Sequence, residues 1–296
     1  MKVRFAVAPT ARSFDTEELG MFASLSEELG FDTIWLSDVP LGALGDPLLS
    51  LAYVSARTMK LRLGANVVPI GRNPMLLARE LAQLDQLSGG RLLLAFVPGV
   101  GQPGERSALG FPKGDRVAMM VEVISLLRRW WSGERVELQE GGFDFRGIRV
   151  HPTPVQSPLE IWMGGAGPKT LERVGQVADG WLTANITPDE AARGREAIQA
   201  AATRHGREID AEHFGISMPY ARSTVSDSTL AVLRARRPND APDLEEIVPV
   251  GPDALVSLLK RHIDAGLSKF VLRPSDPTSL EDDLAWLADV VLPLQS

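Results

Sequence analysis

The chain has 296 residues with a formal net charge of −7, and 44% of its residues are hydrophobic. This length and apolar content suffice for one large core, so we expect a single domain over residues 1–296. The absence of cysteine excludes structural disulfides, thiolate metal sites and cysteine nucleophiles. The acidic balance, without a long Lys/Arg cluster, argues against a nucleic-acid-binding surface.

The N-terminal residues MKVRFAVAPTARSF contain only a short apolar run before polar residues resume. Such a run is too short for the apolar region of a signal peptide or for a membrane-spanning helix. We therefore expect a cytoplasmic protein that does not bind membranes.

Short apolar runs recur along the chain and predict β-strands. In three of them a helix-like segment ends, a glycine follows and the apolar run begins, at Glu27–Asp38, Gly175–Asn185 and His262–Pro274. The other runs, which complete a set of eight candidate strands, are Val3–Ala8, Met59–Pro69, Ser88–Pro98, Leu159–Gly164 and Phe214–Met218.

Helical patterns lie between these runs. Asn73 is placed to cap a helix over Pro74–Leu87, and a second helix over Asp115–Trp131 starts at its own capping residue and stops at Gly133. Strands that alternate with helices pair in parallel, and short apolar runs suit strands buried on both faces. A doubly wound open sheet fits this pattern too, but eight recurring units favour a closed (β/α)₈ barrel.

Two stretches are longer than a connection between a strand and a helix requires. Residues 99–158 contain the Asp115–Trp131 helix and a predicted hairpin at Gly141–Val150, and residues 222–250 are polar and irregular in composition. Long insertions of this kind often form the rim of an active site. We expect both at the C-terminal ends of the barrel strands.

The segment after the Leu159–Gly164 strand is rich in glycine. The residues that join this strand to the next helix are Gly164, Gly165, Ala166, Gly167, Pro168 and Lys169. Backbone N–H groups at such a helix N-terminus can bind a phosphate, and Lys169 would add positive charge. The segment is not a P-loop, because proline rather than glycine precedes Lys169. A tight turn that merely needs glycine explains the spacing equally well.

A second glycine-rich segment, Gly99–Gly104, formally matches the dinucleotide-binding pattern G-x-G-x-x-G. That pattern has to open a helix directly, whereas Pro103 interrupts it and no helical period appears before Asp115. We interpret the segment as a flexible active-site loop.

Asp38 ends the second predicted strand and Arg273 follows the last one. Because barrel enzymes place their functional groups at these strand ends, Asp38 is a candidate catalytic residue and Arg273 a candidate phosphate ligand. Asp38 could equally cap the turn that follows it, and Arg273 could be an ordinary surface arginine. The four histidines show no metal-ligand spacing and no hydrolase triad is evident, so no metal site is predicted.

Four long blocks, in order, carry a family resemblance: ELGFDTIWLSD, KLRLGANVVPIGRNPMLLARELAQLDQLSGGRLLLAFVPG, GFPKGDRVAMMVEVISLLRRWWSGE and PTPVQSPLEIWMGGAGPKTLERVGQVADGW. With them, almost the whole chain resembles the luciferase-like superfamily and, within it, the coenzyme F420-dependent oxidoreductases. The resemblance implies a (β/α)₈ barrel of the bacterial luciferase-like type, with a tricyclic cofactor bound at the C-terminal ends of the strands.

The resemblance also implies roles for individual residues. The loop Gly164–Lys169 would hold the phosphate of the cofactor, and Arg273 is a further candidate contact. Asp38, Asn66 and the backbone of Val67 would orient the ring of the cofactor. A non-proline cis peptide bond is expected between Asn66 and Val67.

The chain departs from its relatives at two positions that usually handle protons. Val39 follows Asp38 where relatives often have histidine, and the loop Val97–Gln102 lacks a glutamate that several of them carry. Either another residue supplies the proton, or the substrate needs none from a side chain, or the protein binds a cofactor without catalysis.

The leading interpretation is an oxidoreductase that transfers a hydride between C5 of coenzyme F420 and a small organic substrate, such as a carbonyl, an alcohol, an imine or an activated alkene. The alternatives are an FMN-dependent monooxygenase and a non-catalytic barrel that binds F420 or a flavin. The resemblance, together with the apolar surface of Asp115–Trp131, also predicts a homodimer.

Overall fold

The computed structural model describes residues 1–9, 14–99, 104–110, 114–140, 143–236, 246–275 and 279–296. Each of the eight predicted runs contains or overlaps a strand of one sheet. These strands are β1 (Arg4–Val7), β2 (Thr33–Ser37), β3 (Arg62–Val67), β4 (Leu92–Phe96), β7 (Ile161–Met163), β8 (Gly180–Ala184), β9 (Phe214–Tyr220) and β10 (Lys269–Pro274).

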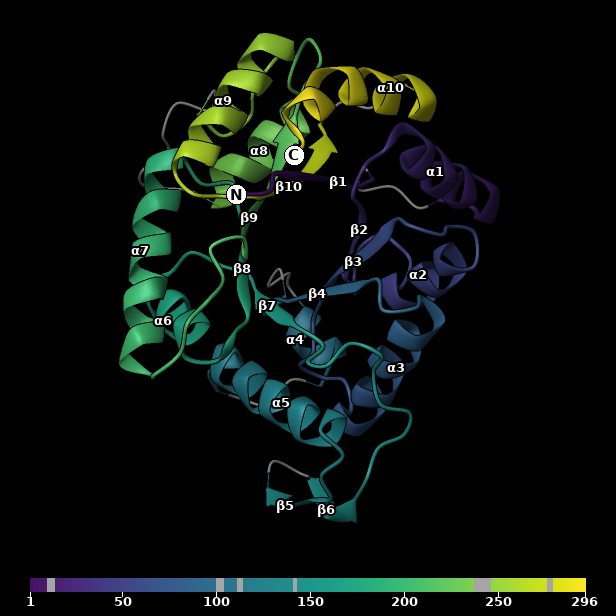
Figure 1. Cartoon of the computed structure of the whole chain (residues 1–296), viewed down its shortest axis with the longest axis vertical. Coiled ribbons are helices and arrows are strands. Elements are labelled where there is room, and N and C mark those ends of the chain that lie inside the picture. Colours follow the sequence, from purple (N-terminus) through teal and green to yellow (C-terminus); the bar gives the residue numbers. More distant parts are fainter. Residues whose placement is uncertain (10–13, 100–103, 111–113, 141–142, 237–245, 276–278) are drawn as a thin grey trace.

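The eight strands close into a parallel barrel in the order β1-β10-β9-β8-β7-β4-β3-β2. This closure confirms the predicted (β/α)₈ barrel and excludes the open sheet. Figure 1 shows the strands in the middle of the molecule with the helices arranged around them. Since all strands run in the same direction, their C-terminal ends meet at one mouth of the barrel.

The outer layer consists of helices, two of which, α3 and α5, were predicted with their bounds. They are α1 (Thr16–Leu29), α2 (Pro47–Ser55), α3 (Pro74–Leu87), α5 (Arg116–Trp131), α6 (Pro168–Val177), α7 (Pro188–Arg204), α9 (Pro252–Asp264) and α10 (Leu280–Val291), with the shorter α4 (Glu105–Ala108), α8 (Asp227–Arg236) and 3₁₀ turn η2 (Leu292–Leu294). The Asn73 side chain accepts hydrogen bonds from the first turn of α3, and Asp115 does so for α5. Both predicted caps are therefore confirmed.

Two tryptophans fill the lumen of the barrel. Trp35 and Trp162 are each 4% exposed, and they are paired in register with Gly64 and Gly180 of the neighbouring strands. A Cβ atom at Gly64 would lie 2.1 Å from Trp35 Cε3, and one at Gly180 would lie 2.4 Å from Trp162 Cε2. Glycine is required at both positions because each indole occupies the space of a neighbouring side chain.

The glycines at the three predicted joints have two different roles. Gly30 and Gly266 follow α1 and α9 with φ values of 92° and 88°, a left-handed conformation that ends a helix. At the third joint, α6 ends at Val177 with Ala178 as its extended C-cap, and Gly180 is already the first residue of β8. There the glycine serves the packing of Trp162 rather than the helix end.

The hairpin predicted at Gly141–Val150 is formed by the antiparallel strands β5 (Val136–Glu140) and β6 (Phe143–Ile148), while residues 141–142 lie outside the described residues. It packs on the end of α5, where Trp130 Nε1 donates to the Ile148 carbonyl over 3.0 Å. Arg116 at the start of α5 donates to the Pro98 carbonyl after β4, and Arg128 near its end donates to the Val177 carbonyl at the end of α6, so α5 runs back along the barrel. The hairpin that follows α5 therefore lies away from the mouth, contrary to the expected rim position, and Figure 1 shows it outside α5. The hairpin covers the Trp130 side chain, which explains the position of the hairpin at the end of α5.

The other irregular stretches contain more helix than expected. Within residues 222–250 the structure has α8, whose Leu233 is buried against Ile247 and Val248. This small apolar cluster stabilises a helix that the polar composition of the segment did not predict. Residues 237–245 lie outside the described part of the chain. Similarly, α4 occupies a segment for which no helix was predicted, and residues 100–103 of the predicted flexible loop are not described.

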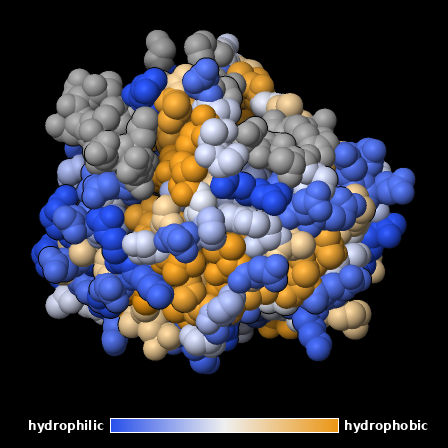
Figure 2. All heavy atoms as spheres, turned by 90° about the horizontal axis from the view of Figure 1, so that it is seen from above, coloured by the Kyte–Doolittle hydropathy of each residue, from blue (hydrophilic) through white to orange (hydrophobic). Residues whose placement is uncertain are grey.

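The outer surface over α9 and α10 is shown in Figure 2. Apolar residues gather along the middle of this face, and hydrophilic residues lie on both sides of them. Among the described helices, none has both the length and the apolar content needed to cross a bilayer.

Candidate active site

The floor of the barrel mouth is a ring of eight residues, one from each strand. Side chains alternate between lumen and helix layer along a strand, and Trp35, Trp162, Leu182 and Val271 mark the lumen-facing positions. Two residues further on, the same face carries the mouth ring, which consists of Ala8, Ser37, Asn66, Val97, Gly164, Ala184, Ser217 and Arg273. Ala184 is exposed and most of the others are half-buried, so the lumen opens at this end.

Asp38 and Asn66 lie side by side where β2 and β3 end. The backbone N–H of Asp38 donates to the Asn66 carbonyl over 2.9 Å, and Asn66 Nδ2 donates to Ser37 Oγ over 3.0 Å. The Asp38 carboxylate is 6% exposed, and its Oδ2 accepts hydrogen bonds from Val68 N at 3.1 Å and from Arg72 Nη2 at 2.9 Å. Asp38 thus ties the two strand ends together, which is close to the turn-capping role left open by the sequence.

Arg72 joins Asp38 to the start of α2. The same Nη2 atom donates to Asp46 Oδ2 over 3.0 Å, and Asp46 is the N-cap of α2. The neighbouring carboxylates raise the pKa of Arg72 against the lowering effect of burial, which is the largest single contribution. The three side chains form a compact charged cluster at one side of the mouth.

A cavity of about 250 Å³ opens beside this cluster, and we call it the mouth pocket. It lies between the loops that follow β2 and β3 and the end of α4. Its lining residues are Asp38, Val39, Pro40, Leu44, Gly45, Asp46, Val68, Ile70, Arg72 and Leu109. The pocket is therefore next to the strand ends at which barrel enzymes carry out their chemistry.

The glycine-rich loop after β7 lies at another part of the mouth. Gly164 N–H donates to the Phe96 carbonyl over 3.0 Å and thus continues the sheet, and a Cβ atom there would lie 2.9 Å from Val97 Cγ1. The Gly165 carbonyl accepts a hydrogen bond of 2.7 Å from Trp181 Nε1, and Gly165 has a φ of 108°. Because a trans peptide points its N–H away from its carbonyl, the Ala166 N–H faces away from Trp181.

The first turn of α6 is open to solvent. Gly167 is its N-cap, no side chain caps the helix, and residues 165–169 are exposed. A Cβ atom at Gly167 would meet nothing closer than Thr170 Oγ1 at 4.0 Å. An exposed helix N-terminus with uncapped backbone N–H groups favours an anion such as a phosphate, and Lys169 adds a positive charge at the same end.

The structure distributes the predicted site residues over three places around the mouth. Asp38, Asn66 and Val67 lie together on β2 and β3, and the loop from Gly164 to Lys169 follows β7. Arg273 lies on β10, with β8 and β9 between it and the loop, and its position in the mouth ring faces the lumen. It is thus a separate positive group at the mouth and not a neighbour of the glycine loop.

The expected cis peptide bond is absent. Within the described residues, cis bonds precede only Pro152 and Pro158, so the Asn66–Val67 bond is trans. Both residues belong to β3, where they pair in register with Ala95 and Phe96, and the regular ladder explains the trans geometry. The Val67 carbonyl accepts a hydrogen bond from Val97 N over 3.0 Å, and the backbone there is engaged in the sheet.

Sequence reasoning missed two residues of the mouth. Arg72 lies in the connection between β3 and α3, just before the Asn73 cap. This position after a strand could have indicated that Arg72 lies at the mouth. Glu105 is 1% exposed, and its Oε1 would lie 2.9 Å from a Cβ atom at Gly99. A glutamate therefore does lie against the loop that follows β4, although it comes from α4, and no sequence pattern reveals this contact.

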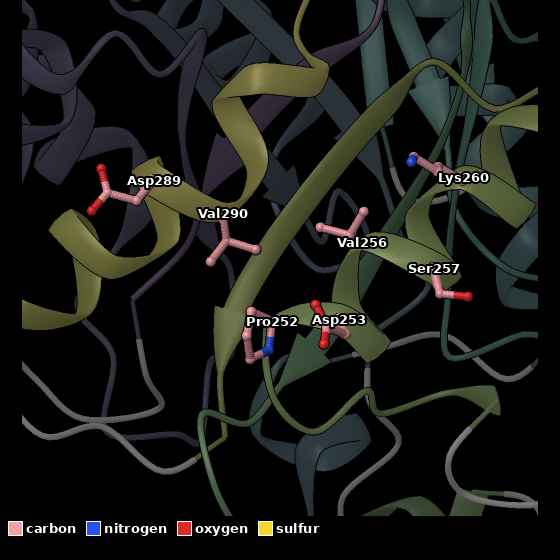
Figure 3. A pocket seen from close by; sticks show the side chains of 7 residues that line it. All are labelled: Pro252, Asp253, Val256, Ser257, Lys260, Asp289 and Val290. Atoms are coloured by element: carbon pink, nitrogen blue, oxygen red, sulfur yellow. The ribbon is translucent and has the colours of Figure 1, made fainter.

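A larger hollow of about 560 Å³ lies outside the barrel, between α9 and α10. Figure 3 shows its lining side chains, among which Asp253, Lys260 and Asp289 are charged and Val256 and Val290 are apolar. It is a surface groove rather than part of the mouth.

Among the described residues, no group of three or more His, Asp or Glu side chains could hold a metal ion.

The parallel barrel, with its open mouth, mouth pocket and glycine loop, defines the class of (β/α)₈ proteins that bind ligands at the C-terminal ends of the strands. Residues 1–243 match the model of the luciferase-like monooxygenase family. The chain belongs to this family.

Two relatives and one solved structure illustrate the similarity. The chain is 29% identical to the 5,10-methylenetetrahydromethanopterin reductase of Methanolobus tindarius, over 64% of this chain and 57% of the relative. It is 30% identical to the F420-dependent glucose-6-phosphate dehydrogenase of Kineococcus radiotolerans, over 58% of this chain and 54% of the relative. The chain thus spans little more than half the length of these relatives.

The solved structure is an F420-dependent secondary alcohol dehydrogenase in complex with an F420-acetone adduct. It superposes with a TM-score of 0.84 over 100% of both chains, at 18% sequence identity. At this identity the likeness supports the fold.

Proposed function

We propose that this protein is a coenzyme F420-dependent oxidoreductase that acts on a small organic substrate. The observation that carries the proposal is the exposed, uncapped N-terminus of α6 behind Gly165–Gly167, at the same mouth as the pocket beside Asp38. One of the two relatives and the superposed solved structure are named as F420-dependent dehydrogenases, which supports the same cofactor.

The residues present fit an F420-type cofactor. The phosphate would be held by the backbone of Gly165, Ala166 and Gly167, with Lys169 nearby, and the open Cβ space at Gly167 leaves room for close approach. Gly164 would act through spacing, because its N–H is used in the sheet, and Pro168 would preform the first turn of α6. Asp38, Asn66 and the backbone near Val67 would position the ring, and Arg273 would face it from β10.

When bound, the cofactor supplies hydride transfer at C5: an alcohol substrate gives a hydride from carbon and releases a proton from its hydroxyl, and a carbonyl does the reverse. The chain has to orient the reacting carbon and handle the proton. Asp38 is our first candidate for the proton, as a buried carboxylate at the mouth, and Glu105 is the second. Ser37 and Asn66 would orient the substrate oxygen through their hydroxyl and amide groups.

The test is a fluorescence titration of the purified protein with coenzyme F420 and, separately, with FMN. We expect tighter binding of F420, followed by substrate-dependent oxidation or reduction of the bound cofactor. Tighter binding of FMN together with oxygen consumption coupled to a substrate would establish the monooxygenase alternative, which the family description supports. Binding of neither would contradict the proposal.

A non-catalytic cofactor-binding barrel is the second alternative, favoured by Val39 and by the loop that lacks a glutamate of its own. Tight F420 binding without turnover on ketones, alcohols, imines and activated alkenes would establish it. Turnover of any of these substrates would exclude it.

We also propose that the chain is a cytoplasmic, single-domain protein that forms a homodimer. The apolar area over α9 and α10 in Figure 2 supports a contact between copies. Light scattering at micromolar concentration should give twice the chain mass of 32.1 kDa. A mass that stays at one chain would contradict the dimer.

A further inference from the structure

We propose that the mouth pocket binds the carbon chain of a small, uncharged substrate, and that Val39 and Leu44 determine which chain length fits. This inference rests on the proposed F420-dependent reaction and adds the substrate class. It follows from the chemistry of the pocket walls, from their charge and from the position of the pocket relative to the glycine loop.

The wall of the mouth pocket has an apolar part and a polar part of similar extent. Its apolar side chains come from the loop after β2, from the loop after β3 and from α4, and they are Val39, Pro40, Leu44, Val68, Ile70 and Leu109. Its volume of about 250 Å³ is below that of typical pockets for drug-sized ligands, which begin at about 300 Å³. The apolar part of the pocket therefore suits a short hydrocarbon chain.

The charges in the wall disfavour an anionic substrate. Asp38 and Asp46 carry two negative charges against the single positive charge of Arg72, and both carboxylates share the same Arg72 nitrogen. A phosphate or carboxylate placed here would meet excess negative charge.

The excess negative charge attracts a cation, but the carboxylates have little free capacity to bind one. The Asp38 side chain is 6% exposed, and its Oδ2 already accepts two hydrogen bonds. Arg72 and Asp46 are about one third exposed and occupied by each other. The charged side chains that the cluster presents to the pocket are already paired with one another. An uncharged carbonyl or hydroxyl group can accept a hydrogen bond from them or donate one to them.

The location agrees with a substrate site rather than a cofactor site. The loops that line the mouth pocket follow β2 and β3, and the glycine loop follows β7, with β4 between β3 and β7 in the closed barrel. A cofactor anchored at the glycine loop would have to extend past the end of β4 before it reached the mouth pocket. The pocket is thus separate from the proposed phosphate site, and a substrate in it can lie beside the cofactor.

The experiment compares variants that narrow or widen the pocket. Val39→Phe adds an aromatic ring to the wall, Leu44→Ala removes part of it, and Val155→Phe is the matched control at a surface position that is 59% exposed. Each variant is assayed with F420 and with a series of secondary alcohols and methyl ketones of increasing chain length. Glucose 6-phosphate and secondary amines serve as the anionic and cationic probes.

In the unaltered protein we expect kcat/KM to rise about fourfold per added methylene until the pocket is full. Leu44→Ala should raise the ratio of kcat/KM for long over short chains about tenfold, and Val39→Phe should lower it about tenfold. Both should bind F420 within about twofold of the unaltered protein, and Val155→Phe should match it in every respect. Glucose 6-phosphate and the amines should be poor substrates.

Three outcomes would overturn the inference while leaving the F420 reaction intact: a preference for glucose 6-phosphate, a preference for amines, or chain-length profiles that neither variant changes. Weaker F420 binding in Val39→Phe would assign the pocket to the cofactor and overturn it as well. If the unaltered protein does not bind F420 at all, the proposed function itself fails, and the titration alone detects this.

Discussion

Replacement of Gly167 by aspartate should abolish cofactor binding while leaving the fold as stable as before, or slightly more so. Gly167 is the N-cap of α6, and its φ of −71° is accessible to any residue. Aspartate at an N-cap accepts hydrogen bonds from the first turn and gains a few tenths of a kcal/mol over glycine. Its carboxylate would then occupy the position proposed for the phosphate and repel the negative charge of the phosphate. We therefore expect the Kd for F420 to rise more than about 100-fold.

Two further variants separate the causes. Gly167→Asn caps the helix without a charge and should weaken binding less than Gly167→Asp. Gln176→Asp, at an exposed position in the last turn of α6, adds the same charge away from the loop and should leave the affinity unchanged. Thermal melting and F420 titration of the same samples provide the two readouts. Unchanged F420 affinity in Gly167→Asp would rule out this loop as the phosphate site.

Acid should destabilise the protein through His262 by roughly 3 kcal/mol between about pH 6.5 and pH 4. His262 is fully buried in α9, and neither ring nitrogen has a hydrogen-bond partner among the described residues. Burial, with a smaller contribution from Arg261, lowers its pKa from 6.5 to about 4. In this window the unfolded chain binds a proton that the folded chain does not, so stability falls as the pH falls; above about pH 6.5 this residue adds no pH dependence.

Urea unfolding at a series of pH values measures this effect. His262→Leu removes the titrating group at similar volume and should flatten the curve in this window relative to the unaltered protein, without loss of stability at neutral pH. His205→Leu, at a side chain that is 37% exposed, is the matched control and should keep the slope. An identical slope in His262→Leu and the unaltered protein would show that His262 is not protonated on unfolding in this range.

The barrel could be predicted because its signals are local. Asn73 and Asp115 cap helices whose starts are visible in the sequence, and Gly30 and Gly266 end helices in a conformation that favours glycine. The short helices were missed because their stability is not local. Leu233 of α8 is buried by Ile247 and Val248, which come later in the chain, and nothing in the α8 segment itself shows that contact.

The same distinction between local signals and contacts made by distant residues applies to the candidate site. The glycine loop and Asp38 stand next to strand ends, so their place at the mouth followed from the strand predictions alone. The bridge from Arg72 to Asp38 and Asp46 joins residues that are 34 and 26 positions apart, and a bond of this kind depends on how two connections pack. The expected geometry at Asn66–Val67 came from resemblance rather than from the residues, and the regular pairing of β3 contradicts it.

Trp35 and Trp162 close the barrel beneath the mouth ring, each in the space left by a glycine on the next strand. The depth of the mouth is therefore determined by these two indoles, whereas its width is determined by loop residues such as Val39 and Leu44. The two dimensions belong to different parts of the chain. A shorter side chain at Trp35 would deepen the cavity from below without touching its rim, which makes the lumen a second and independent route for redesigning the size of the bound molecule.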